Sequence, residues 1–191
     1  MCMSVRNGGR PLLATTMTLS LALMLAGFVA GFQANLAVGA EPLPVLPAGR
    51  SHTWLSAVGQ ILLVNVPALC LVFSGVITGG LTTLIAWPLT AVYIGATMRI
   101  GQVQLGVAEV VSSIWIYAPV EFLALLLAAG AGLMPITAAV RSTLVNNEPI
   151  TPLNQYVRVF PFALKTFGVA SILLAAAAVL EATVLAFKGF V

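Results

Sequence analysis

Residues 115–133 read WIYAPVEFLALLLAAGAGL, and this stretch gives the clearest indication of the fold class. It is apolar over nearly its whole length and carries one charged side chain, Glu121, close to its start. A membrane-spanning helix needs about 20 apolar residues. A charged side chain at mid-membrane costs roughly 2.5–3.5 kcal/mol. The stretch therefore predicts a membrane-spanning helix in which Glu121 needs a partner, a proton or a function.

The composition of the whole chain also indicates a membrane protein. Of its 191 residues, 60% are hydrophobic and 7% are charged, whereas soluble domains carry about 25% charged residues. The apolar runs are continuous, unlike the short alternating segments of a membrane β-barrel. We therefore predict an all-α, polytopic helical membrane protein that forms a single domain over residues 1–191 and has the lipid bilayer as a partner. Lysine and arginine are too few for a nucleic-acid surface.

The apolar runs and the polar stretches between them predict the order of the spans. Residues 102–116 are too short and too polar for a full span, so we expect a re-entrant or interfacial half-helix there. The polar stretch 141–158 is expected to be the longest loop and a possible docking site for a partner, although a plain connector is the simpler interpretation. Five membrane spans are expected, at about residues 12–36, 57–77, 81–98, 117–138 and 162–187.

The basic residues predict the orientation. With five spans, one side holds Arg6, Arg10, Arg141, Arg158 and Lys165, and the other side holds Arg50, Arg99 and Lys188. The positive-inside rule then places the N-terminus in the cytoplasm. A sixth span over 102–116 would reverse the later part of this pattern. The first apolar run is longer than the core of a signal peptide, so we expect it to be retained as a helix.

Polar side chains within the predicted spans are the candidate functional residues. The five-span topology places Glu109, Glu121 and Glu181 in the outer half of the membrane, where they are expected to share one level. Tyr117 precedes Glu121 and is a possible hydrogen-bond donor. The expected interhelix polar network comprises Asn65, Arg99, Glu109, Tyr117, Glu121 and Glu181, with Arg99 as the nearest cation.

Glycines are expected to let the helices approach closely. Small residues spaced four apart are typical of packed membrane helices. The two cysteines, Cys2 and Cys70, have no cysteine or histidine neighbours that would suit a metal site. We expect no metal and no cofactor. The glycines predicted to pack against neighbouring helices are Gly27, Gly31, Gly75, Gly79, Gly130 and Gly132.

The segment Tyr117-Ala-Pro-Val-Glu121, with the Ala/Gly-rich helix that follows, resembles the central motif of the stage II sporulation protein M family. Glu181, late in the last span, and Asn65, which opens a glycine-rich span, are similar to two further features of that family. The layout of the spans is also similar. Members typically have a His-Gly pair four and three residues before the glutamate, where this chain has Tyr117 and Ala118.

The resemblance implies an accessory or scaffold protein of a bacterial plasma-membrane complex. Such complexes act in sporulation, or in the export and maturation of bacteriocin-like peptides and immunity to them, often beside an ABC transporter. The implied partners are an ABC transporter or enzyme complex, a second copy of the chain, or a hydrophobic or cationic peptide.

Two other classes of function stay open. The first is a membrane-embedded enzyme, or a subunit of one, that modifies a peptide or lipid with Glu109, Glu121 and Glu181 as acid–base groups and Tyr117 as a donor. The second is a transporter with glutamates on a proton or cation path. Motifs of known catalytic sites, such as HExxH, are absent from the sequence. A non-enzymatic role is therefore the preferred interpretation.

Overall fold

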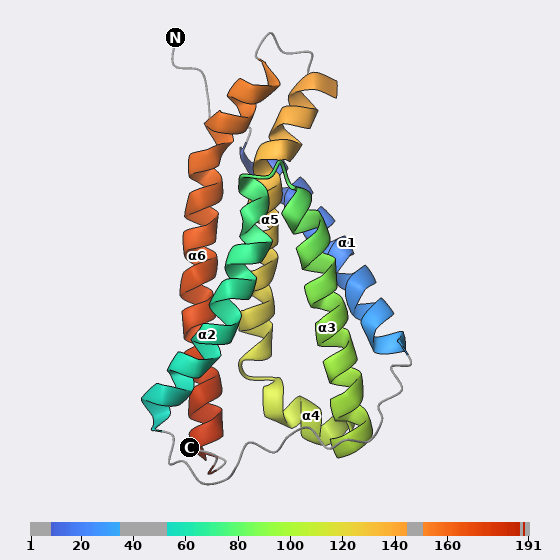
Figure 1. Cartoon of the computed structure of the whole chain (residues 1–191), viewed down its shortest axis with the longest axis vertical. Coiled ribbons are helices and arrows are strands. Elements are labelled where there is room, and N and C mark those ends of the chain that lie inside the picture. Colours follow the sequence, from blue (N-terminus) through green and yellow to red (C-terminus); the bar gives the residue numbers. More distant parts are fainter. Residues whose placement is uncertain (1–8, 35–52, 145–150, 188, 190–191) are drawn as a thin grey trace.

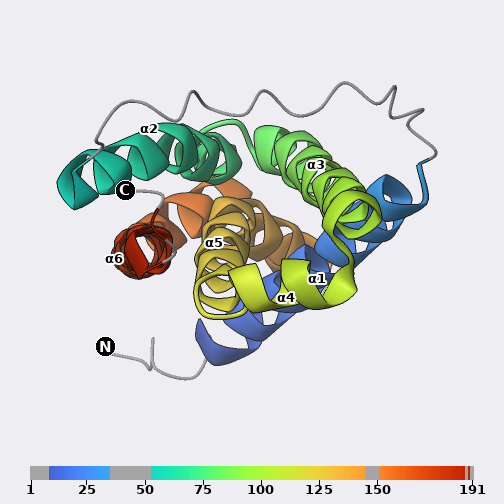
Figure 2. The ribbon, with the colours of Figure 1, turned by 90° about the horizontal axis from the view of Figure 1, so that it is seen from below.

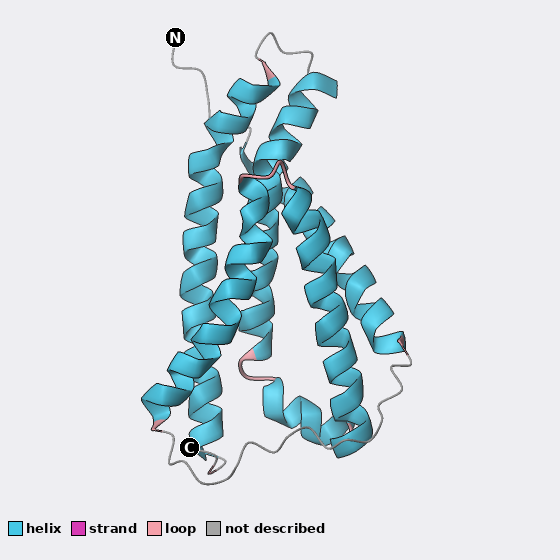
Figure 3. Ribbon diagram, viewed as in Figure 1, coloured by secondary structure: helices cyan, strands magenta, loops and turns pink. Residues whose placement is uncertain are grey.

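The described part of the protein consists of helices and short turns. The computed structural model describes residues 9–34, 53–144, 151–187 and 189. Within these residues there are helices, one short 3-10 helix and no strand (Figure 3). The elements are α1 (Gly9–Gln33), α2 (Trp54–Phe73), η1 (Ser74–Val76), α3 (Leu81–Leu105), α4 (Val107–Ile114), α5 (Ala118–Leu144) and α6 (Pro152–Phe187).

Five of the described helices, all except α4, are long and apolar enough to cross a membrane. In Figure 1, α1 runs from the upper end to the lower end, α2 returns, α3 descends, α5 rises and α6 descends. The α2–α3 turn, the end of α5 and the start of α6 therefore share the upper end with the start of α1, and the lower end holds α4. The prediction of an all-α polytopic membrane protein is confirmed.

The central helix is α5. Viewed from the end that carries α4, it lies in the middle of the bundle, with α6, α2, α3 and α1 around it (Figure 2). Its most extensive partner is α6, while α1 packs mainly on α3. Small side chains allow α5 and α6 to come close. The buried alanines of this pair are Ala124, Ala128, Ala129 and Ala131 on α5 and Ala163, Ala170, Ala177, Ala178 and Ala182 on α6.

Glycines close the α1–α3 pair. A Cβ added at Gly27 would lie 2.5 Å from the Pro88 carbonyl oxygen, and one added at Gly31 would overlap the Val92 carbonyl oxygen. Gly95, on α3, is pressed in the same way against the backbone of α1. Contact of this kind between backbones is typical of small-xxx-small helix pairs. The predicted packing roles of Gly27 and Gly31 are confirmed, and Gly95 has one that we did not predict.

A second close junction joins α2, α3 and α5 at the buried Thr83. The Thr83 hydroxyl donates a hydrogen bond of 2.6 Å to the Val72 carbonyl oxygen. Gly75 and Gly132 both face this hydroxyl, and a Cβ on either glycine would overlap it. The two predicted packing glycines therefore serve the same purpose, since each leaves room for one polar side chain.

The remaining two glycines predicted to pack, Gly130 and Gly79, have different surroundings. Gly130 packs against the Met17 side chain of α1, as predicted. A Cβ added at Gly79 would meet no heavy atom within 4 Å, and this residue has φ +63°, so its predicted packing role is wrong. Gly79 and its neighbour Gly80, with φ +86°, form the turn before α3. Glycine adopts these left-handed conformations without the steric penalty of other residues.

The boundary between α3 and α4 also differs from the prediction. The third span was expected to end near residue 98 and the half-helix to cover 102–116, but α3 continues to Leu105 and α4 covers Val107–Ile114. Gly106 separates them with φ +86° and ψ 156°, a conformation that glycine readily adopts. α4 lies across the end of the bundle (Figures 1 and 2), which fits the interfacial form of the predicted half-helix rather than the re-entrant form.

Most of the predicted loop 141–158 is helical. α5 extends to Leu144, and α6 begins at Pro152, ten residues before the predicted start of the last span. The Thr151 hydroxyl accepts a 3.4 Å hydrogen bond from the Asn154 amide, and proline at the first helical position needs no such partner. α2 also starts earlier than predicted, since Thr53 caps it at Trp54. The predicted end of the first span, residues 35–36, lies outside the described residues.

Candidate functional site

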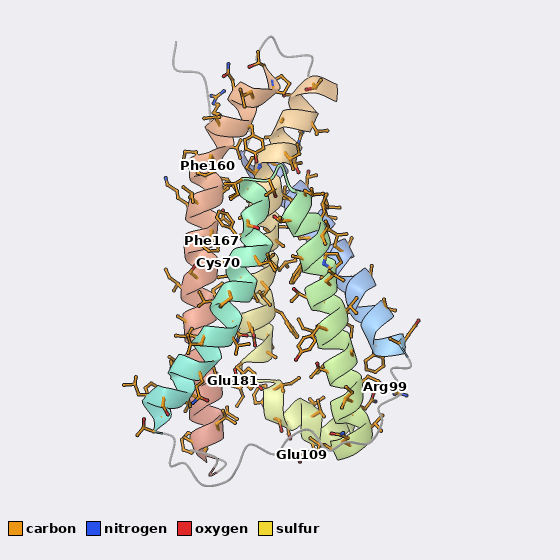
Figure 4. The ribbon with its side chains drawn as sticks, in the orientation of Figure 1. Cys70, Arg99, Glu109, Phe160, Phe167 and Glu181 are labelled. Atoms are coloured by element: carbon orange, nitrogen blue, oxygen red, sulfur yellow. The ribbon has the colours of Figure 1, made fainter. Side chains whose placement is uncertain are left out.

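The best candidate site lies at the end of the bundle where α2 and α5 begin and α6 ends. The Trp54 indole Nε1 donates a 3.3 Å hydrogen bond to the Thr183 hydroxyl, which ties the start of α2 to the last turns of α6. Figure 4 shows Glu181 at this end of α6. Tryptophan is enriched at membrane–water interfaces. The site therefore lies near one interface and inside the apolar span.

Tyr117 and Glu121 are positioned by the start of α5. The Tyr117 carbonyl oxygen accepts hydrogen bonds from the amides of Val120 (3.0 Å) and Glu121 (3.1 Å), so the helix begins directly after it. Pro119 fits this first turn because its missing N–H would have no helical partner. Glu121 also lies in the first turn, where the helix dipole favours a negative charge. Both side chains are half-buried.

Glu181 approaches the same point from α6. Its neighbour Ala182 is fully buried, and Glu181 itself is half-buried at the α5–α6 contact. Tyr117, which precedes the membrane-spanning part of α5, is close enough to both carboxylates to be affected by their charge. Burial, together with the charges of Glu181 and Glu121, raises the pKa of Tyr117 to about 12. Tyr117, Glu121 and Glu181 therefore form one cluster, which we call the acidic cluster.

The chemistry available to the acidic cluster is proton binding and hydrogen bonding. Two carboxylates inside an apolar span are costly when both are charged. Protonation of either carboxylate lowers this cost, and the neutral Tyr117 hydroxyl is a hydrogen-bond donor. Throughout the part of the chain that the structure describes, no group of three histidine, cysteine or acidic side chains is placed to hold a metal ion.

Glu109 does not join the acidic cluster. It lies on α4, exposed at the end of the bundle (Figure 4). Its carbonyl oxygen accepts hydrogen bonds from the hydroxyls of Ser112 (2.9 Å) and Ser113 (2.8 Å), within the same short helix. The half-helix predicted to carry Glu109 is α4, which follows α3 after Leu105, and the common level expected for the three glutamates stays a prediction.

Arg99 is not the cationic partner of the acidic cluster. Its guanidinium lies 5.5 Å from the centre of the Phe32 ring on α1, and its Nη1 donates a 3.3 Å hydrogen bond to the Gln102 side chain. Both contacts belong to the α1–α3 side of the bundle. Neither contact is with Glu121 or Glu181, the carboxylates of the acidic cluster. A cation–π contact of this kind contributes about 0.5–1 kcal/mol at an exposed site.

Asn65 also lies away from the acidic cluster. It is half-buried in the middle of α2, eleven residues or about 16 Å of helix beyond Trp54. It shares a helix face with the buried Leu69 and Val72, so it lies towards the inside of the bundle. Of the six residues in the predicted polar network, the structure brings together Tyr117, Glu121 and Glu181.

The opposite end of the bundle carries a feature that the sequence did not reveal. The end of α5 (residues 139–144) and the start of α6 (residues 152–160), here called the α5–α6 hairpin, extend past the α2–α3 turn (Figure 1). The Tyr156 hydroxyl donates a 2.7 Å hydrogen bond to the Val76 carbonyl oxygen at that turn. Thr151 followed by Pro152 was the available sign that a helix begins there.

Comparison with known proteins adds no relative: no protein-family model, no curated protein and no solved structure matches the chain.

Proposed function

We propose that this chain is a multi-pass accessory or scaffold subunit of a membrane complex, and that it recruits a partner protein through the α5–α6 hairpin. The observation that carries the proposal is the exposure of Leu153 (70%) and Val157 (60%) on the hairpin. They are four residues apart, so they lie on one helix face. Apolar side chains beyond the α2–α3 turn gain little from lipid, and a partner protein that covers them would gain from their burial.

The charge of the hairpin indicates the chemistry of that partner. Arg141, on the α5 side of the hairpin, is half-buried. It forms no ion pair with another residue that the structure describes. An amphipathic helix with apolar and acidic side chains would complement both the aliphatic pair and this arginine. We therefore propose a partner surface of this kind.

The interior of the bundle agrees with a scaffold role. The middle of α5 is filled by alanine and glycine against α6, α1 and α2, and its largest buried side chains are Leu133 and Met134. Such packing fixes helix positions.

The resemblance in the sequence suggests a bacterial plasma-membrane complex with the N-terminus in the cytoplasm, of the sporulation type or of the peptide export and immunity type. The hairpin would then face the cytoplasm.

Site-specific photocrosslinking in the native host tests this proposal. A photoreactive amino acid at Leu153 is expected to give one discrete protein adduct, and the same amino acid at Leu63 serves as the control. Leu63 is 76% exposed on the middle of α2, where it faces lipid. The adduct partner is then identified by mass spectrometry and tested for stoichiometric copurification in mild detergent.

The identity of the partner decides between the possible complexes. A transporter subunit or peptide-modifying enzyme supports an export and immunity role, and a cell-wall hydrolase supports the sporulation type. Adducts to lipid alone from both positions, together with purification of the chain without a partner, would contradict the proposal. Crosslinks between two copies of the chain would replace it with self-association.

Proton or cation coupling is a second candidate function, favoured by the acidic cluster. Two membrane-embedded carboxylates and a hydroxyl at the contact of two spans resemble the composition of proton-binding sites in transporters. In liposomes with an imposed pH gradient, such a protein would dissipate the gradient, and Glu121→Gln with Glu181→Gln would abolish the flux. Equal flux in both proteins would exclude this role for the cluster. The same groups are the candidates for acid–base catalysis on a peptide or lipid.

A further inference from the structure

One face of α6 changes from cationic to apolar along its length. Arg158, Phe162, Lys165, Val169 and Ile172 follow each other at intervals of four and three residues, so they lie on one side of the helix. All five are exposed, and none is buried by another part of the described structure. Val157 points about 100° and Leu153 about 140° away from this face, because each residue of an α-helix turns the side chain by about 100°.

The two cations of this face are placed to share one ligand. Seven residues, about 10.5 Å of helix, separate the α-carbons of Arg158 and Lys165. Neither side chain has an ion-pair partner among the residues described. Both side chains are long enough to bend towards the space between them, as such chains do at membrane interfaces. An anion located between the two levels would contact both.

The length of α6 indicates the depth in the membrane at which the space between Arg158 and Lys165 lies. The Trp54–Thr183 hydrogen bond marks one interface. Lys165 lies eighteen residues from Thr183, about 27 Å along the helix, and Arg158 lies about 37 Å from it. The hydrocarbon core of a bilayer is about 30 Å thick, and the headgroup layers add about 5–8 Å on each side. The space between Arg158 and Lys165 therefore coincides with the phosphate layer of the opposite leaflet.

The apolar part of the face lies at the level of the acyl chains. Val169 (52% exposed) and Ile172 (71% exposed) follow Lys165 into the hydrocarbon core. Phe162 lies at the edge, between the two cations. A bound phospholipid would thus place its phosphate against Arg158 and Lys165 and one acyl chain along Val169 and Ile172.

We propose that this face of α6 binds an anionic phospholipid, with Arg158 and Lys165 holding its phosphate. A headgroup with net negative charge is favoured over a zwitterionic one, since two cations face it and the described part of this surface offers no carboxylate beside them. Two cations near a membrane surface together favour an anionic phospholipid over a zwitterionic one by a factor on the order of 30.

Native mass spectrometry of the protein with phosphatidylglycerol and phosphatidylcholine tests this proposal. The wild-type protein is expected to retain phosphatidylglycerol in preference to phosphatidylcholine, and the Arg158→Gln/Lys165→Gln variant is expected to lose that preference by about 30-fold. Arg99→Gln is the matched control, because Arg99 is an exposed cation on a different helix. A preference that survives in the double variant, or that falls equally in the control, overturns the proposal.

Two further measurements distinguish a lipid site from a plain anion site and from a folding defect. Inorganic phosphate is expected not to displace phosphatidylglycerol, and displacement at millimolar concentration would make this a plain anion site and overturn the lipid assignment. Should the double variant not fold, Phe162→Trp with both cations intact provides a second readout. Brominated phosphatidylglycerol is expected to quench its added fluorescence more strongly than brominated phosphatidylcholine, and equal quenching contradicts the proposal.

Discussion

The α1–α3 pair and the α5–α6 pair solve the same packing problem with different residues. α1 and α3 meet through Gly27, Gly31 and Gly95, so backbone lies against backbone. α5 and α6 meet through alanines, which bury their methyl groups along the contact. Glycine allows the closest approach but tolerates no added atom, whereas alanine allows close packing over a longer contact.

The polar groups are distributed unequally between the two pairs. α5 and α6, with the residue just before α5, carry Tyr117, Glu121, Glu181, Arg158 and Lys165. The α1–α3 pair has the buried Thr16, Ser20 and Thr83, and its Arg99 is engaged by Phe32 and Gln102. We infer that α1–α3 is mainly a structural frame and that α5–α6 carries the functional groups. Substitutions in the two pairs are therefore expected to have different effects.

The largest effect is expected from Gly31→Leu in the frame. Its side chain would overlap the Val92 carbonyl group, which belongs to the α3 backbone and cannot move without displacing the helix. Overpacking of this kind costs about 3 kcal/mol or more. The measurement is thermal unfolding in nanodiscs. Gly59→Leu is the control, since Gly59 faces open space, and equal loss in both variants would refute a glycine-specific contact.

A smaller loss is expected from Gly132→Ala, where α5 meets the frame. The added methyl group would overlap the Thr83 hydroxyl and lie 2.9 Å from the Val72 carbonyl oxygen. We expect a destabilisation of about 1–3 kcal/mol. A neutral Gly132→Ala would mean that the junction has room to adjust around an added methyl group.

Gly168→Ala should instead stabilise the protein by up to about 1 kcal/mol, because Gly168 lies in an open position on α6 and alanine favours helix.

Removal of charge from the acidic cluster is expected to stabilise the protein under alkaline conditions. When Glu121 and Glu181 are both ionised, they repel each other inside an apolar span. The Glu121→Gln/Glu181→Gln variant should then be more stable than wild type by up to about 3 kcal/mol. Thermal unfolding at alkaline pH measures this, with the exposed Glu109→Gln as control. A destabilised double variant would show that the carboxylates make essential structural contacts.

The ionisation of Tyr117 gives a spectroscopic prediction. Its pKa is raised from 10.0 to about 12, so the folded state favours the neutral phenol. The resulting stabilisation is fully present below pH 10 and is lost as the pH rises through 12. Ultraviolet absorbance of the phenolate, compared with Tyr117→Phe, measures the titration. Glu181→Gln should lower the pKa only in part, because burial is the larger cause.

The smallest effect is expected from Trp54→Phe. This change removes the 3.3 Å hydrogen bond to the Thr183 hydroxyl and keeps an aromatic ring at the interface. Hydrogen bonds between membrane helices contribute about 0.6 kcal/mol on average. A double-mutant cycle with Thr183→Ala measures the coupling in nanodiscs. A coupling free energy of zero would mean that the Trp54–Thr183 hydrogen bond cannot be used to locate the membrane interface.

The sequence predicted the spans because long apolar runs have few structural solutions in lipid. Boundaries were less predictable. Gly106 could be recognised as a helix breaker, yet its exact effect depends on φ +86°, which the sequence does not specify. The start of α6 was missed because its first turns are polar, and hydropathy alone does not reveal a helix that continues beyond the membrane.

The candidate site was predicted in part. The pairing of Glu121 with Glu181 follows from two adjacent antiparallel spans, each with one acid near the same end. Arg99 was misassigned because its helix packs on α1, and the contact of its side chain with the Phe32 ring depends on which helices are neighbours. Sequence spacing orders residues along a helix, but it does not determine how helices are arranged around the bundle axis.

The length of α6 has a mechanical consequence. Its 36 residues form a continuous rod of about 54 Å from the hairpin to the turns beyond Glu181. Displacement along the axis at one end is transmitted to the other, since helical hydrogen bonds resist compression. Sideways force is different: Pro161 lacks one backbone donor, so bending compliance concentrates there. We therefore expect axial displacement to pass along the whole helix and sideways bending to concentrate at Pro161.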